Sequence, residues 1–101
     1  MFTMKELKPY FEMAATIEIN GMNFTLSNVE ELSGLHAVWV SESIKVYATP
    51  DFEDIPVPVH VIDCNGQEIG MDTYTAEIES FERYCEVVQI LTAKILRRSQ
   101  M

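Results

Sequence analysis

Alternating apolar and polar residues flank two Asn-Gly pairs in this chain, Asn20-Gly21 and Asn65-Gly66. An Asn-Gly pair between alternating runs favours a tight β-hairpin turn, because both residues tolerate the positive φ that such a turn requires. The sequence therefore predicts two hairpins, one over residues 15–26 and one over residues 57–73.

The first hairpin separates its apolar and polar side chains cleanly. A two-residue turn at Asn20-Gly21 places Ile19 opposite Met22 and Ile17 opposite Phe24. The polar residues then share the other face: Thr16, Glu18, Asn23 and Thr25. This pattern predicts a strand pair with one face in the core and one in water.

The second hairpin carries apolar groups on both faces. A two-residue turn pairs Ile62 with Ile69 and His60 with Met71, while three valines occupy the opposite face: Val57, Val59 and Val61. Such a strand is either an interior strand covered on both sides or an oligomer contact. The sequence leaves both interpretations open.

Residues 35–40 and 44–49 predict another antiparallel pair, joined around residues 41–43. Its apolar residues on one face are Ala37, Trp39, Val46 and Ala48. Residues 28–34 are predicted to form a short acidic connector or a single helical turn.

A long helix is predicted at the end of the chain, with Thr75 as its N-cap and Glu77 and Glu79 in its first turn. Its apolar stripe, expected to cover the sheet, is Phe81, Tyr84, Cys85, Val88, Leu91, Thr92 and Ile95. Near the start of the chain a short helix should end before Ile17, because Pro9 would interrupt a longer one.

The predicted fold class is α+β. We expect an antiparallel meander of about six strands, arranged as three hairpins, with the short N-terminal helix and the long C-terminal helix packed on one face. The length of 101 residues and the absence of a linker predict a single domain over residues 1–101.

The charge of the chain is strongly negative and unevenly distributed. Its formal net charge is −9, and residues 1–82 carry three basic and fifteen acidic side chains, whereas residues 83–101 carry four and one. Such a field repels phosphate backbones and attracts basic surfaces. Direct nucleic-acid binding is therefore disfavoured, and a basic protein partner is expected.

The sequence predicts a cytoplasmic protein that does not enter a membrane. Charged residues and Pro9 interrupt the segment where a secretory signal would need an apolar stretch, and no apolar run approaches the length of a membrane span. Cys64 and Cys85 are too few for a disulfide framework. Whether they are bridged is left open.

No catalytic or cofactor motif is present, so we expect a protein that is not an enzyme and needs no cofactor. His36 and His60 are the two histidines, and Cys64 follows His60 by four residues. On a strand that spacing is about 13 Å, too long for a hydrogen bond or a shared metal. The glycines occur in no phosphate-binding spacing.

Two acidic segments are candidate binding elements. The loop over residues 50–56 lies between two prolines and sets an aromatic residue among carboxylates: Asp51, Phe52, Glu53 and Asp54. On the C-terminal helix Glu79, Glu82 and Glu86 share a face with Ile90. Acidic surfaces with an apolar anchor suit docking to a basic partner.

The leading hypothesis is a small interaction module, acting as an inhibitor, adaptor or subunit that binds a basic surface. In composition the chain resembles small acidic proteins of bacteriophages and mobile elements that block host defences, which implies a nucleic-acid mimic and a nucleic-acid-handling partner. The alternative is a small-ligand or metal-binding protein using a pocket between sheet and helix, with His60, Tyr74, Tyr84 and Asp63. A homodimer is compatible with either hypothesis.

Overall fold

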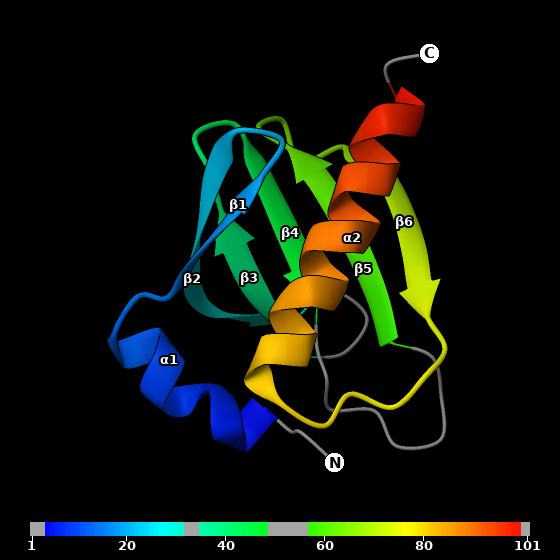
Figure 1. Ribbon diagram of the computed structural model, residues 1–101. Coiled ribbons are helices and arrows are strands. Elements are labelled where there is room, and N and C mark those ends of the chain that lie inside the picture. Colours follow the sequence, from blue (N-terminus) through cyan, green and yellow to red (C-terminus); the bar gives the residue numbers. More distant parts are fainter. Residues whose placement is uncertain (1–3, 32–34, 49–56, 100–101) are drawn as a thin grey trace.

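The computed structural model describes residues 4–31, 35–48 and 57–99 and has the predicted α+β fold (Figure 1). Six antiparallel strands form one sheet whose spatial order equals their chain order. They are β1 (Thr16–Ile19), β2 (Met22–Glu31), β3 (Leu35–Val40), β4 (Ile44–Ala48), β5 (Val57–Asp63) and β6 (Glu68–Tyr74).

Two helical segments flank this meander, as predicted. A 3-10 helix, η1 (Met4–Leu7), runs into the short helix α1 (Lys8–Glu12), and the long helix α2 (Phe81–Ser99) crosses one face of the sheet (Figure 1). The apolar core lies between this face and α2.

The first hairpin has the predicted register. Ile17 pairs with Phe24 and Ile19 pairs with Met22. Asn20 has a φ of 52° and Gly21 a φ of 81°, so both turn residues are left-handed, as a two-residue type I′ turn requires. The apolar face of β1 is buried and its polar face is exposed.

The second Asn-Gly pair forms a different turn. Gly66 has a φ of 80°, but Asn65 has no positive φ, and the Gly66 amide donates to the Asp63 carbonyl oxygen at 3.0 Å. The Asp63 carboxylate also accepts hydrogen bonds from the amides of Asn65 and Gln67, at 2.9 and 3.0 Å. These bonds favour a three-residue turn that ends in a left-handed glycine.

This longer turn shifts the register next to it. Ile62 pairs with Glu68, so the predicted pairing of Ile62 with Ile69 is wrong, whereas His60 pairs with Met71 as expected. The shift leaves Ile69 without a partner across the ladder, and its side chain packs against the core instead.

The predicted connector over residues 28–34 is wrong in its described part, because β2 continues as a strand to Glu31. The pairing with β3 shifts by one residue between Leu26 and Asn28. Such a bulge reverses which residues face the core, so the strand no longer shows a regular alternation in the sequence. Residues 32–34 lie outside the described residues.

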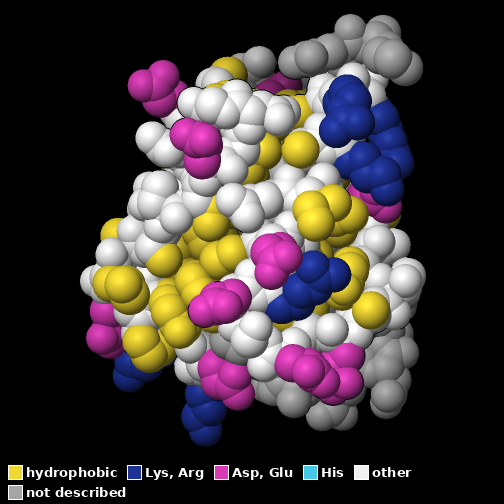
Figure 2. All heavy atoms as spheres, viewed as in Figure 1, with side chains coloured by type: hydrophobic (Ala, Val, Ile, Leu, Met, Phe, Trp, Pro, Cys, Tyr) yellow, Lys and Arg dark blue, Asp and Glu magenta, His cyan; other side chains and the backbone are white. Residues whose placement is uncertain are grey.

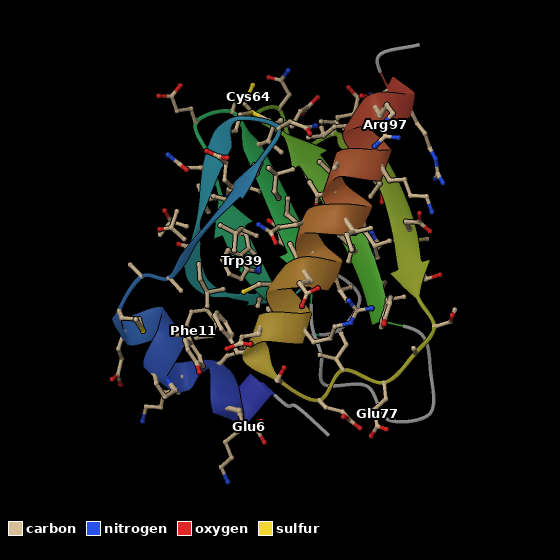
Figure 3. The ribbon with its side chains drawn as sticks, viewed as in Figure 1. Glu6, Phe11, Trp39, Cys64, Glu77 and Arg97 are labelled. Atoms are coloured by element: carbon tan, nitrogen blue, oxygen red, sulfur yellow. The ribbon has the colours of Figure 1, made fainter. Side chains whose placement is uncertain are left out.

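The central strands of the sheet direct apolar side chains toward α2. Ala37, Trp39, Val46 and Ala48 are fully buried together in the core, as predicted (Figure 3 shows Trp39 between sheet and α2). Two of the valines of β5, Val59 and Val61, are buried in the same core, and β5 is an interior strand paired with β4 and β6. Their burial needs no second copy of the chain.

Helix α2 begins later than predicted. Its first residue is Phe81, and the Ser80 hydroxyl oxygen accepts a hydrogen bond from the Arg83 amide at 3.2 Å. Ser80 is therefore the N-cap, and the prediction of Thr75 was wrong. Glu77 and Glu79 consequently precede the helix, and Glu82 is the acidic residue of its first turn.

Pro9 begins a helix rather than interrupting one. It occupies the first turn of α1, where the fixed φ of proline is suitable and its missing amide proton is not needed. Directly before α1, Leu7 is fully buried in the core, so its side chain packs the N-terminal helical segment against the rest of the domain. The Tyr10 ring adds a second attachment by stacking on Phe81 of α2, with ring centroids 3.6 Å apart.

A short chain of hydrogen bonds crosses the core between sheet and helix. The Trp39 indole Nε1 donates to the Tyr84 hydroxyl at 3.2 Å, and that hydroxyl donates to the Ala48 carbonyl oxygen at 2.8 Å. Trp39 and Tyr84 are both fully buried. Each hydrogen bond therefore satisfies a polar group that water cannot reach.

These burials predict a loss of stability at alkaline pH. Burial raises the pKa of Tyr84 well above its ordinary 10.0, and burial raises the pKa of Cys85 from 9.0 to about 11. Both groups therefore stay protonated to a higher pH in the folded state than in the unfolded state. Their contribution to the free energy of unfolding is complete below about pH 9 and is lost as the pH rises.

We expect the free energy of unfolding, measured by urea denaturation, to fall between about pH 9 and about pH 11, with Tyr84 alone contributing about 1.4 kcal/mol per pH unit above about pH 10. A Tyr84→Phe variant should show a shallower fall over the same range. A stability that stays constant to about pH 11 in the parent protein would contradict this assignment.

Candidate functional site

Half of the predicted binding residues cannot be placed. Asp51, Phe52, Glu53 and Asp54 lie outside the described residues. The other four lie on or directly before α2.

Helix α2 carries its predicted binding residues on the side away from the sheet. Glu82, Glu86 and Ile90 follow one another at four-residue spacings and are exposed, with Ile90 at 56%. Glu79 is also exposed but lies in the segment before the helix. We call Glu79, Glu82 and Glu86 the acidic face.

Arg83 interrupts the acidic face and ties it to β6. Its Nη1 lies 3.3 Å from a carboxylate oxygen of Glu86, and its Nη2 donates to the Tyr74 hydroxyl at 2.7 Å. The hydrogen bond to Tyr74, with a further contribution from Glu86, raises the pKa of the Arg83 guanidinium. Glu86 is therefore partly neutralised, whereas Glu82 has no ion pair among those found in the described part of the chain.

An apolar surface adjoins the acidic face. Figure 2 shows hydrophobic side chains gathered between α1, the start of β1 and α2, with acidic side chains around them. Met13 is 67% exposed, Phe11 and Ala15 are half-buried against the core, and Figure 3 shows Phe11 between α1 and α2. We call these three residues, together with Cys85, the α1–α2 patch.

Contacts on either side place Cys85 in this patch. One turn before it, Phe81 stacks on Tyr10 of α1, and one turn after it the Gln89 side-chain amide donates to the Glu18 carbonyl oxygen of β1 at 3.1 Å. Residues four apart share a helix face. The half-buried Cys85 thiol therefore faces the space between α1, β1 and α2.

Carboxylates border this patch on two sides. Glu12, at the end of α1, is exposed on one side, and Glu82 and Glu86 lie along the other. An apolar centre with a charged rim is the usual composition of a protein-binding surface.

The residues predicted from the sequence include the α2 side of this site but not the α1 side. The signal was available, because Tyr10, Phe11 and Met13 are large apolar residues close together in the chain.

The residues of the alternative ligand pocket do not converge. Tyr84 is buried and bonded within the core, and Tyr74 is bonded to Arg83. His60 lies on the sheet face opposite α2 and approaches Glu68, with Nδ1 and Oε1 2.9 Å apart. Asp63 holds the β5–β6 turn. The predicted pocket built from these four residues is therefore wrong.

A hollow of about 330 Å³ lies between the β3–β4 and β5–β6 turns, where Lys45, Asp63 and the exposed Cys64 meet. Within the described ranges, no three or more His, Cys, Asp or Glu side chains are grouped so that they could hold a metal ion. Both cysteines are free thiols.

The described part of the chain contains no helix with the length and apolar character needed to cross a membrane.

The fold defines an α+β protein with an antiparallel six-stranded meander. No protein-family model matches the chain, and neither a curated protein nor a solved structure with significant similarity was found.

Proposed function

We propose that this protein is a non-enzymatic interaction module that binds a basic surface of another protein, as an inhibitor, adaptor or subunit. The observation that carries the proposal is the α1–α2 patch bordered by Glu12 on one side and by Glu82 and Glu86 on the other. The net charge of −9 supports it, because a negative field accelerates encounter with a basic partner.

The two components of the surface have different roles in this proposal. Met13, Phe11 and Ile90 supply apolar area whose burial drives association, while the carboxylates select for lysine and arginine on the partner. The acidic loop residues 51–54 belong to the same proposal as a second contact.

A more specific form of the proposal is nucleic-acid mimicry, in which these carboxylates occupy the phosphate positions of a partner's DNA or RNA groove. In that form the partner is a nucleic-acid-handling protein, and double-stranded DNA should compete with this chain for it. We place the interaction in the cytoplasm, in keeping with the two free thiols.

Charge reversal on the acidic face tests the proposal. We expect the double variant Glu82→Lys/Glu86→Lys to lose partner proteins that the tagged parent protein captures from a lysate of its native host. Captured partners should also dissociate from the parent as salt rises from about 50 mM to about 500 mM, because salt screens exposed charges. Mass spectrometry identifies the retained proteins, and competition by DNA tests the mimicry form.

The matched control is Glu42→Lys/Glu77→Lys, which makes the same charge change at two exposed glutamates outside the patch. This control should retain the partners. Equal loss in both double variants would show a nonspecific charge effect, and partners unaffected by either variant or by salt would contradict the proposal.

A further inference from the structure

The two outer strands of the sheet differ in how their free edges are covered. Among the described strands, β1 and β6 each have a neighbour on one side only. At β1, the Glu18 carbonyl oxygen accepts a hydrogen bond from Gln89 of α2 at 3.1 Å, so the helix covers part of that edge. At β6, the helix supplies cationic side chains instead.

The ladder shows which backbone groups of β6 face outward. Thr73 pairs with Pro58, which has no amide proton, so the two residues are not joined by ladder hydrogen bonds. The Thr73 amide donates instead to the carboxylate of the adjacent Asp72, at 2.8 Å. Because outward and inward amides alternate along a strand, the Met71 amide lies on the same free edge.

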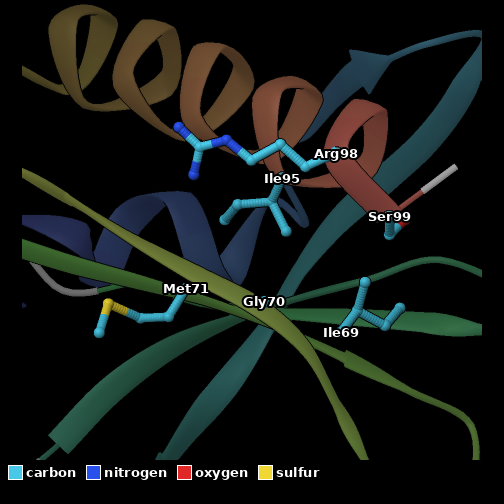
Figure 4. A pocket seen from close by; sticks show the side chains of 6 residues that line it. All are labelled: Ile69, Gly70, Met71, Ile95, Arg98 and Ser99. Carbon is cyan, nitrogen blue, oxygen red and sulfur yellow. The ribbon is translucent and has the colours of Figure 1, made fainter. Parts of the chain in front are cut away.

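A hollow beside this edge can accept a side chain from an added strand. A Cβ atom on Gly70 would lie 2.7 Å from Ile95 Cγ2, so Ile95 packs directly on the glycine backbone. Figure 4 shows Ile95 and Arg98 reaching from α2 over β6 at Gly70. The hollow has a volume of about 180 Å³, and its walls include Met71 and Ser99.

The side chains above this edge are basic, in contrast to the rest of the molecule. Lys94 and Arg98 are 52% and 58% exposed, and their nitrogens lie 3.8 and 3.5 Å from the same oxygen of Asp72. Arg97 adds a third exposed cation in the last turn of α2. Two of these three cations share one carboxylate, and Figure 2 shows the basic cluster at one corner of the molecule.

The charge also decides against a second copy of this chain as the occupant. Antiparallel pairing of two β6 edges around a two-fold axis would bring Lys94 and Arg98 of both copies to the same shared edge. Like charges at such a contact repel each other. An occupant that carries carboxylates would instead be attracted.

We propose that the β6 edge binds an extended acidic segment of a partner protein, which adds a strand to the sheet and places its carboxylates beside Lys94, Arg97 and Arg98. The added strand accepts a hydrogen bond from the Met71 amide, and it replaces the Asp72 carboxylate as the acceptor of the Thr73 amide. One of its side chains enters the hollow beside Gly70 and Ile95. This site is separate from the α1–α2 patch and does not depend on the function proposed for it.

The test is an NMR titration of the full chain labelled with 15N. The probe is an acetylated and amidated peptide in which Glu alternates with Val, matching the seven residues of β6 in length. We expect the Met71 and Thr73 amide signals to shift on titration, with binding weakened by salt. The same peptide with Lys in place of Glu should cause no comparable shift.

Two variants at one position test the backbone contact. Met71→Pro removes an edge amide proton without removing a ladder bond to β5, and it should weaken binding of the Glu peptide by about tenfold or more. Met71→Ala keeps the amide and shortens only one wall of the hollow, so it should bind the Glu peptide more tightly than Met71→Pro does. Thermal unfolding of both variants verifies that each is folded before the comparison.

Four results would overturn the proposal. The first is no shift of the Met71 and Thr73 signals at millimolar Glu peptide, and the second is equal binding of the Lys peptide. The third is a folded Met71→Pro variant that binds as well as Met71→Ala. The fourth is self-association of the parent, measured by sedimentation equilibrium, that Met71→Pro abolishes, because it would identify a second copy as the occupant.

Discussion

Replacing Tyr84 with Phe is expected to destabilise the protein by about 2 to 3 kcal/mol. The substitution keeps the ring in place but removes the hydroxyl that accepts from Trp39 Nε1 and donates to the Ala48 carbonyl oxygen. Both partners are then left in a core that water does not reach, which costs more than the loss of a solvated hydrogen bond.

Urea denaturation of the parent and the variant at neutral pH measures this difference. The matched control is Tyr10→Phe, which removes a hydroxyl from a half-buried ring whose described contact is stacking on Phe81. That control should change the stability by less than about 0.5 kcal/mol. If Tyr84→Phe were as mild as Tyr10→Phe, the hydrogen bonds through Tyr84 would not stabilise the core.

Leu7→Ala is expected to cost about 2 to 5 kcal/mol, the range for truncating a fully buried leucine. Leu7 is completely buried, whereas α1 directly after it contains no buried residue. Its side chain is thus the main apolar anchor of the N-terminal helical segment. Without it, the Tyr10–Phe81 stacking would have to hold α1 against α2.

The same substitution should also weaken partner binding, because α1 supplies Phe11, Met13 and Glu12 to the proposed binding surface. Urea denaturation measures the stability, and capture of the partner at a temperature where the variant is folded measures the binding. Lys8→Ala, an exposed neighbour, serves as the control for both. A Leu7→Ala variant that is destabilised but binds normally would separate α1 from the interaction surface.

The local pattern of apolar and polar residues was sufficient to predict most strands of the sheet. At the first hairpin, alternation and the Asn20-Gly21 turn agree, and the register of Ile17 with Phe24 follows from residues that are close in the chain. The buried face of α2 could also be predicted from the sequence, since the helical spacing places Tyr84, Val88 and Ile95 on one face.

Predictions from the local sequence were wrong where a side-chain hydrogen bond or a β-bulge altered the turn type or the strand pairing. The same Asn-Gly pair gives a two-residue turn at residue 20 and a three-residue turn before Gly66, because the Asp63 carboxylate accepts two amides at the second site. The bulge after Leu26 concealed the continuation of β2. The N-cap of α2 is Ser80 rather than Thr75, and the sequence does not distinguish them because both carry a hydroxyl that can cap a helix.

For the binding surfaces, the sequence determined the charge and the composition, and the tertiary structure determined which residues meet. The spacing of Glu82, Glu86 and Ile90 on one helix required no more than the helical repeat. That Met13 and Phe11 join them depends on how α1 docks, which is set by contacts between residues far apart in the chain, such as Tyr10 with Phe81. The free edge of β6 beside the cations of α2 likewise follows from the strand order and from the packing of Ile95 on Gly70, which no local pattern encodes.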